Sequence, residues 1–273
     1  MATTSGSSLS SAPILTAELT ARIERHTAPQ PDAPATNDRN IQVVRFGNAI
    51  ARQVKGYWPT NAVFCFGGDD LDRLHEIFSF FGSVDPLFYL AHGRFTREVG
   101  SALSLSGYRP TSWKQTILYG LPLDDGLPDP PGIAVELVTA DTAAIAADVA
   151  AGGNEWPEAW RESAKEGVRQ SVAQEKAKFF LARCDDEPAG VASLSTKPSE
   201  NETWASLLDA AVVPRFRSRG IHRALLRHRL RHAALLGCAL VIGAADFGSA
   251  SFRNQQRAGL RLAYVEMTWA RNR

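Results

Sequence analysis

A proline-rich segment divides this chain of 273 residues. Residues 121–132, LPLDDGLPDPPG, hold four prolines, two glycines and three aspartates. Proline lacks the backbone N–H that a helix interior or a central strand needs, so neither element can continue through this segment. We interpret residues 122–131 as a linker between two halves, each of about 130 residues and therefore long enough to bury its own core.

The second half alternates between strand-like and helix-like runs, which apolar spacing distinguishes. Residues 177–195 form a predicted hairpin, because Asp-Asp-Glu-Pro between two apolar runs supplies turn residues. The other predicted strands are residues 132–140, 204–213, 238–245 and 260–270, and the predicted helices are about 142–151, 156–173, a helix that ends near Gly237, and 249–259. This order predicts an α/β fold of mixed α+β type, with helices layered on a sheet.

The first half has a shorter version of the same rhythm. Asp69 or Asp70 is placed to cap a helix with an apolar stripe, and the half ends in SGYR where the second half ends in AGLR. The predicted helices are residues 14–26, 67–82 and 96–107, and the predicted strands lie within 41–54, 61–67, 86–92 and 108–120. This parallel favours a diverged internal duplication.

Composition excludes several classes of protein. The net charge of +1 predicts neither a nucleic-acid nor a membrane partner, and no apolar run is long enough to span a bilayer. The three cysteines are far apart and have no metal-site spacing, which indicates free thiols in a reducing, cytoplasmic compartment. Residues 1–12 lack the pattern of a secretory signal, so we expect a short disordered tail there. We expect a monomer or a homodimer.

Residues 212–226, VVPRFRSRGIHRALL, predict an anion site at a strand–turn–helix junction. Pro214 ends the strand, and Gly220 permits a tight turn before a helix whose first N–H groups have no partner. Seven arginines fall between residues 215 and 231, and no acidic residue occurs from 210 to 245. A solvated arginine face explains Arg227, Arg229 and Arg231. A nucleic-acid contact would need a wider basic surface with aromatic residues. A phosphate cradle accounts for the proline, the glycine and the arginines together.

The motif V-x-P-x-x-R-x-x-G, here Val212 to Gly220, resembles the acyl-CoA-binding motif of the GNAT superfamily of N-acyltransferases. The segment SFRNQQRAGLRLAY resembles that family's second conserved segment, and the hairpin resembles the strand pair before the motif. The resemblance covers about residues 132–270. It implies two GNAT-like domains, each a mixed central sheet flanked by helices: a degenerate N-terminal domain over 13–121 that binds no CoA, and a catalytic domain over 132–273.

The resemblance also implies how acetyl-CoA would be bound as cosubstrate, with no metal. Backbone amides of the turn would hold the pyrophosphate, and the strand before it would pair with the pantetheine arm. Helix residues of the later segment would contact the far side of that arm. The residues implied are Ala211, Val212, Val213, Arg217, Ser218, Arg219, Gly220, Ile221, His222, Arg223, Ser251 and Asn254.

Two positions depart from the family pattern. His222 stands where a small residue is usual, and Gln255 stands where a tyrosine usually donates a proton to the leaving thiolate. Tyr264 is a possible substitute for that tyrosine. Asp209, a lone carboxylate in an apolar strand, is the best candidate for the base, against a structural hydrogen-bonding role.

Other candidate residues favour structural roles. His228 and His232 have metal-compatible spacing, but a packing face is favoured because no third ligand is evident. Trp156 and Trp160 are expected in the core, with an aromatic wall for the acceptor as the alternative. We expect Cys184 and Cys238 to be buried strand residues.

The sequence therefore predicts an N-acetyltransferase that moves an acetyl group to a primary amine of a small molecule by direct attack. The missing tyrosine leaves a non-catalytic CoA-binding regulatory module as the alternative, and a nucleic-acid-associated protein as a third reading. The acceptor's identity does not follow from the sequence.

Overall fold

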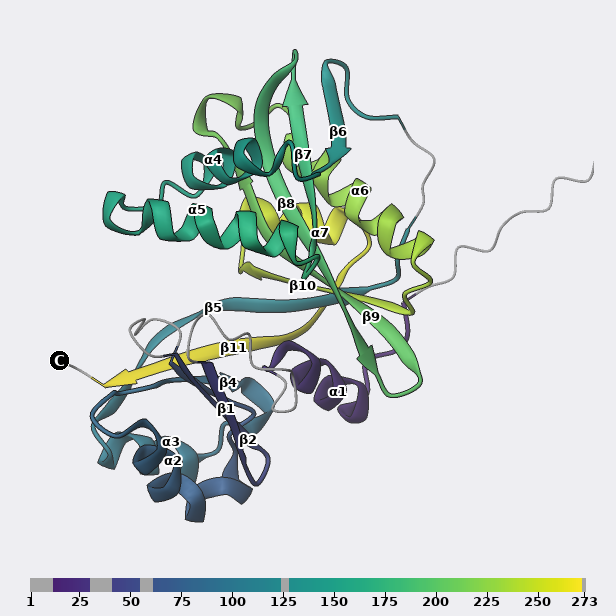
Figure 1. The fold of residues 1–273 in the computed structure, drawn as a ribbon. Coiled ribbons are helices and arrows are strands. Elements are labelled where there is room, and N and C mark those ends of the chain that lie inside the picture. The colour runs from purple at the N-terminus through teal and green to yellow at the C-terminus, as the bar shows by residue number, and fades with distance from the viewer. Residues whose placement is uncertain (1–11, 30–40, 55–60, 124–127, 272–273) are drawn as a thin grey trace, which may run out of the picture. The chain divides into compact units, whose positions relative to one another are not determined.

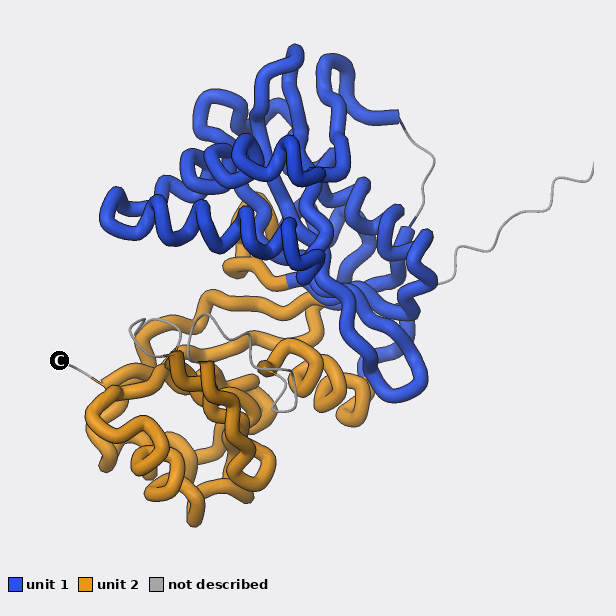
Figure 2. Tube along the Cα trace, viewed as in Figure 1, with its two compact units in different colours: residues 1–15, 119–243, 253–261 blue, residues 16–118, 244–252, 262–273 orange. Residues whose placement is uncertain are grey.

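The chain forms two compact units in a computed structural model that describes residues 12–29, 41–54, 61–123 and 128–271 (Figures 1 and 2). Unit 1 contains residues 1–15, 119–243 and 253–261, and unit 2 contains residues 16–118, 244–252 and 262–273. Residues 1–11 of the predicted disordered tail lie outside the described residues. Residues 124–127, in the middle of the predicted linker, also lie outside them.

Unit 1 is a mixed sheet with helices on both faces. The strands lie in the order β10-β9-β8-β7-β6, and only β9 and β10 run parallel. Val191 packs with α4 residues in one cluster, whereas a side chain on Gly190 would meet Ile221 of α6. Because neighbouring strand residues face opposite ways, α4 and α6 cover opposite faces. The elements are β6 (Ile133–Leu137), α4 (Ala143–Gly153), α5 (Glu158–Ala173), β7 (Lys178–Cys184), β8 (Glu187–Ser199), β9 (Glu202–Val212), α6 (Ile221–Leu235), and parts of β10 (Leu240–Asp246) and α7 (Ala250–Arg257).

In unit 2 the strands follow the order β1-β2-β3-β4-β11-β5, with both antiparallel and parallel pairs. Ala49 and Ala51 of β2 pack in an aromatic-rich core with α2 and α3, and Ile50 between them packs on the other face with Ala28, which follows α1. The elements are α1 (Ala17–Thr27), β1 (Ile41–Phe46), β2 (Ala49–Val54), β3 (Ala62–Phe64), α2 (Leu74–Phe81), β4 (Leu87–Ala91), α3 (Arg97–Leu105), and most of β5 (Tyr108–Gly120) and β11 (Arg261–Arg271).

The mixed α/β fold predicted from the sequence is confirmed, and the predicted helices and strands are present with shifted ends. The two units nevertheless differ from a division at the linker. Strands β5, β10 and β11 each contribute residues to both units, and β11 pairs with β4 of the first half, with Glu266 opposite Ala91. Among the described residues, no helix is long and apolar enough to cross a membrane.

Candidate functional site

The junction between β9 and α6 presents free backbone amides at a left-handed turn. A 3₁₀ turn at Pro214–Phe216 follows the strand, and both Ser218 (φ 66°) and Gly220 (φ 91°) have positive φ. The first hydrogen bond of α6 runs from the Ala224 amide to the Gly220 carbonyl, at 3.0 Å. The amides of residues 221–223 therefore have no carbonyl one helical turn earlier, and they lie at the positive end of the helix dipole. Such a turn is a ready anion-binding site.

The arginine side chains of the turn contact protein groups, and the amides remain the open donors. Arg217 donates to the carbonyl oxygens of Val212 and Gly153 and to the Glu155 carboxylate, at 3.2, 3.1 and 2.8 Å. The Arg217 amide itself donates to the Pro214 carbonyl, so it is not available to a ligand.

Arg215 and Arg219 also have protein contacts. Arg215 pairs with Glu187 at 2.7 Å and lies over the Phe216 ring, and the Arg219 guanidinium lies 5.7 Å from the centre of the same ring. These contacts brace the turn from outside.

Strand β9 carries a bulge just before the segment predicted to pair with pantetheine. Its register with β8 shifts between Leu208 and Ala211, and Asp209 there has a φ of 48°. The pairing of β9 with β10 ends at Leu207 opposite Gly243, while β9 continues to Val212 paired with β8. The edge of β9 after the bulge is therefore not bonded to β10 in that register, which suits a ligand's amide groups.

Asp209 lies at this bulge and is exposed to solvent, although protein atoms crowd its carboxylate. Burial raises the pKa of the Asp209 carboxyl, and two neighbours oppose the rise: the Ser193 hydroxyl, which donates to it at 3.3 Å, and the charge of Arg229. A raised pKa brings a carboxylate closer to the working range of a general base.

Arg229 lies beneath the bulge and is buried. The prediction that it belongs to a solvated arginine face is therefore wrong. The residue is 2% exposed. Its guanidinium donates to the carbonyls of Leu225, Ser193 and Leu208, at 3.2, 3.3 and 3.2 Å. The last two carbonyls belong to a residue pair of β8 and β9 that lies directly next to the register shift. Burial lowers the pKa of Arg229 to about 10, so it remains charged near neutral pH.

Two predicted CoA contacts, His222 and Asn254, meet across α6 and α7. The Asn254 amide nitrogen lies 3.2 Å from Nδ1 of His222. Burial, aided by the charge of Arg229, lowers the pKa of His222 to about 4. A neutral imidazole accepts a hydrogen bond at Nδ1, and this contact links the two helices.

Gln255 lies where β9 and β10 stop pairing. Its side chain is buried and rests on Gly243, where a Cβ atom would collide with the amide oxygen. Tyr264 is the predicted substitute for the family's tyrosine, and it belongs to unit 2. Its hydroxyl lies 3.3 Å from the Thr27 hydroxyl. Burial raises the pKa of the Tyr264 hydroxyl strongly.

A second basic feature, which the sequence reasoning missed, is a hollow of about 490 Å³ between α6, α7 and the proline-rich segment. Three arginines give it positive charge: Arg223 and Arg227, four residues apart on α6, and Arg257 on α7. Leucines give it an apolar floor. The spacing of Arg223 and Arg227 by four residues was a signal for a shared helix face. The lining is Leu123, Pro128, Arg223, Leu226, Arg227, Leu230, Asn254, Arg257 and Ala258.

The proline-rich segment contacts α6 within unit 1. Arg227 donates to the Pro128 carbonyl at 2.8 Å, and His228 Nε2 lies 2.7 Å from the Asp129 carboxylate. The His232 ring packs edge-on against Phe180. No group of three metal-ligating side chains gathers within the part of the chain that the structure describes.

The remaining candidates have ordinary environments. Trp156 packs against the α4 core as predicted, whereas Trp160 is 48% exposed and is not a core residue. Cys184 and Cys238 are buried free thiols, as predicted. Cys184 ends β7, whereas Cys238 precedes β10 and is not a strand residue. Ser251 lies in the first turn of α7.

Comparison with known proteins identifies the segment that holds the turn. Residues 149–254 match the model of the acetyltransferase (GNAT) family. No curated protein sequence matches the chain.

Solved structures share the fold over nearly the whole chain. A GCN5-related N-acetyltransferase from Kribbella flavida has 15% sequence identity and a TM-score of 0.63, and the match covers 85% of this chain and 90% of that protein's chain. A tandem GNAT protein from the clavulanic acid biosynthesis pathway has 16% identity and a TM-score of 0.60, covering 93% of both chains. A GCN5-related N-acetyltransferase from Sphaerobacter thermophilus has 17% identity and a TM-score of 0.56, covering 95% and 94%. The fold of this chain is therefore a GNAT fold.

Proposed function

We propose that the protein transfers an acetyl group from acetyl-CoA to a primary amine of a small molecule, because residues 149–254 match the model of the acetyltransferase (GNAT) family. The observation that carries this proposal is the left-handed turn before α6. It lies inside the matched segment and follows directly on the strand whose pairing with β10 ends. An acyl-CoA needs both features, an anion site for its phosphates and an open strand edge for its arm.

The chemistry of the donors fits CoA. The amides of residues 221–223 point out of a helix N-terminus and suit the pyrophosphate. The arginine-lined hollow beside the same helix suits the remaining phosphate and the adenosine, because guanidinium forks bind phosphate and leucines cover an apolar ring. Asn254 lines this hollow and also contacts His222, so it belongs to the same binding surface.

The chain's own groups supply the transfer step. Residues 211–213 would hold the pantetheine arm along the edge of β9, with the thioester near the bulge. Asp209 would take a proton from the acceptor's ammonium, directly or through water, and the freed amine nitrogen would attack the thioester carbonyl. Backbone N–H groups would stabilise the oxyanion while the carbon–sulfur bond breaks and the thiolate leaves.

A non-catalytic CoA-binding module is the second candidate, and Gln255 favours it. A carboxamide donates a hydrogen bond to a thiolate but does not protonate it. Tyr264 is hydrogen-bonded to Thr27 in unit 2. In an enzyme, the thiolate would then take its proton from water or from the protonated nitrogen of the tetrahedral intermediate.

Calorimetry with acetyl-CoA tests the turn. Gly220→Glu should weaken binding at least tenfold, because a carboxylate enters the cradle at a residue whose φ of 91° already disfavours a side chain. Gly237→Glu is the matched control, since Gly237 also has a positive φ, 67°, but ends the same helix with no atoms near its Cβ position. If the Gly220→Glu variant and the wild type bound acetyl-CoA with equal affinity, the phosphates of CoA would bind somewhere other than this turn.

Release of free CoA with a panel of amines separates the two candidate functions. An enzyme should release CoA faster with at least one primary amine than without any. Binding of acetyl-CoA without such release would favour the non-catalytic module. No binding of acetyl-CoA would contradict both.

A further inference from the structure

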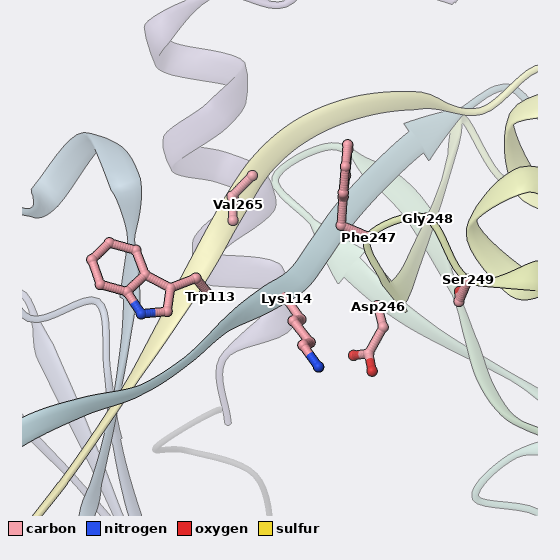
Figure 3. A pocket seen from close by; sticks show the side chains of 7 residues that line it. All are labelled: Trp113, Lys114, Asp246, Phe247, Gly248, Ser249 and Val265. Carbon is pink, nitrogen blue, oxygen red and sulfur yellow. The ribbon is translucent and has the colours of Figure 1, made fainter.

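A hollow in unit 2 lies outside every site considered so far. Its volume is about 650 Å³, and its lining comes from β5, from the turn after β10 and from β11 (Figure 3). None of the residues that the sequence assigned to CoA or to catalysis lines it. All the lining residues belong to unit 2: Trp113, Lys114, Asp246, Phe247, Gly248, Ser249 and Val265.

The turn that forms one wall of the hollow is held by its own hydrogen bonds. The Phe247 amide donates to the Lys114 carbonyl at 2.6 Å, which fixes the turn to β5. The Ser249 amide donates to the Asp246 carbonyl at 3.0 Å, and the Ser249 hydroxyl accepts from the Phe252 amide at 3.1 Å. The wall is thus built before any ligand arrives, which lowers the entropic cost of binding.

Two large aromatic side chains of the hollow remain open to solvent. Trp113 is 60% exposed and Phe247 is 64% exposed. The Phe247 ring rests against Phe252, with 5.1 Å between ring centres, so its position is supported from behind. Exposed aromatic surface at a concave site is typical of ligand recognition, because a ligand that covers it removes apolar area from water.

Two opposite charges also line the hollow. Figure 3 shows the Lys114 ammonium and the Asp246 carboxylate extending to the same side of the strands. Both residues are exposed, and neither side chain forms an ion pair with another residue in the described ranges. We propose that the hollow binds a small molecule that carries an ammonium and a carboxylate on an apolar body, that is, an α-amino acid with an aromatic or aliphatic side chain.

Each part of such a ligand has a counterpart in the hollow. The ammonium would lie at Asp246 and the carboxylate at Lys114, and charge-assisted hydrogen bonds are the stronger kind. The apolar side chain would cover Trp113 and Phe247. A purely cationic amine would leave Lys114 unused, and a purely anionic ligand would leave Asp246 unused, so the pair of charges selects for a zwitterion.

Calorimetry on the full chain, without acetyl-CoA, tests the proposal with three matched probes. Phenylalanine carries both charges, phenethylamine lacks the carboxylate, and 3-phenylpropanoate lacks the ammonium. Phenylalanine should bind roughly tenfold more tightly than either, the change that 1.4 kcal/mol produces. Equal binding of all three, or no binding of phenylalanine at about 10 mM, would overturn the proposal.

Substitutions assign each charge to its partner. Asp246→Asn should abolish the preference for phenylalanine over 3-phenylpropanoate, and Lys114→Gln should abolish the preference over phenethylamine. Lys176→Gln, at an exposed lysine of unit 1, is the matched control and should leave all three affinities unchanged. Unaltered preferences in the first two variants would show that the hollow does not bind these probes.

The proposed binding of an amino acid does not depend on acetyl transfer. An acetylation assay with acetyl-CoA shows whether the bound amino acid is the acceptor or a separate ligand. If the bound amino acid becomes acetylated with acetyl-CoA, it is the acceptor. If it binds and is not acetylated, it is a separate ligand of unit 2. Failure of acetyl-CoA to bind contradicts the proposed function and leaves the calorimetric result for the hollow intact.

Discussion

Arg229 places a buried positive charge beneath the bulge of β9. Removing a charged group from water is costly, and three backbone carbonyls repay part of that cost. Two of these carbonyls belong to Ser193 and Leu208, the residue pair directly next to the register shift, where the ladder of the sheet is locally disrupted. Arg229 therefore stabilises the bulge and, through its charge, lowers the pKa of Asp209 against the effect of burial.

Arg229→Met should lower the free energy of unfolding by roughly 2–4 kcal/mol, because buried carbonyls lose their donor. It should also move the acidic limb of the pH–rate profile to higher pH, since Asp209 loses a neighbouring positive charge. Arg229→Lys keeps the charge and should keep the limb in place. Urea unfolding and a pH profile of CoA release measure the two effects.

The partly exposed Arg169 of α5 supplies the control for this experiment. Arg169→Met should change stability by less than about 0.5 kcal/mol, because its ion pair with Glu166 lies at the surface. An unshifted acidic limb in the Arg229→Met variant would show that Arg229 stabilises the fold without acting on Asp209.

Asp209→Asn should reduce turnover at least a hundredfold while leaving the affinity for acetyl-CoA unchanged, because the amide keeps the shape and cannot accept a proton. The measurements are CoA release at saturating amine and calorimetry with acetyl-CoA. Full turnover in this variant would remove Asp209 as the base and leave it a structural role in the bulge.

At the scale of elements, periodic spacing was enough to predict most helices and strands. Pro214 and Gly220 also placed the turn correctly, because each limits the backbone at its own position. The fate of single arginines was not predictable in the same way. Arg227, Arg229 and Arg231 look alike in sequence, yet Arg229 lies on the sheet-facing stripe with Leu225 and Ala233, one helical turn away on either side.

The bulge at Asp209 also left no clear trace in the sequence. A β-bulge arises from the register between two strands, and a single residue of positive φ among apolar neighbours gives no local pattern. The hollow between α6 and α7 was missed for the same reason, because it joins residues of α6, α7 and the proline-rich segment that are distant in the chain.

The contact between His222 and Asn254 should couple α6 to α7. A double-mutant cycle with His222→Ala and Asn254→Ala should give a coupling energy of about 0.5–1.5 kcal/mol, the usual net value of one hydrogen bond. Because the pKa of His222 lies at about 4, the coupling should be constant from pH 6 to 8. Urea unfolding of the four proteins measures it, and additive effects of the two substitutions would show that the contact contributes nothing.

At the scale of the whole molecule, the two units are not consecutive in sequence. The last strand, β11, pairs with β4, so most of a strand from the second half completes the sheet of the first. The linker predicted from its prolines separates most of each unit, but strand pairing over such a sequence distance depends on complementary edges and not on local composition. A fragment that starts at residue 132 would therefore carry residues 262–271 without their partner strand.

That shared strand carries a buried carboxyl group that makes the stability of unit 2 depend on pH. Glu266 of β11 is 9% exposed, and burial, with the nearby charge of Glu24, raises its pKa to about 7 from an ordinary value of 4.5. Between these two values the folded state binds more protons than the unfolded state, so stability should fall as pH rises from about 5 to 8. The full loss is up to about 3 kcal/mol.

Glu266→Gln should remove this dependence, because a neutral amide replaces the group that must ionise inside the sheet. The variant should match the wild type near pH 5 and exceed its stability near pH 8, as measured by urea unfolding across that range. Glu98→Gln is the matched control: Glu98 begins α3 at the surface, and hydrogen bonds with its own backbone and with Thr96 lower its pKa, so it titrates below this window. The wild-type slope should persist in that control. A Glu266→Gln variant that keeps the wild-type slope would assign the pH dependence to another group, and Glu24, whose pKa burial also raises, would be the next to test.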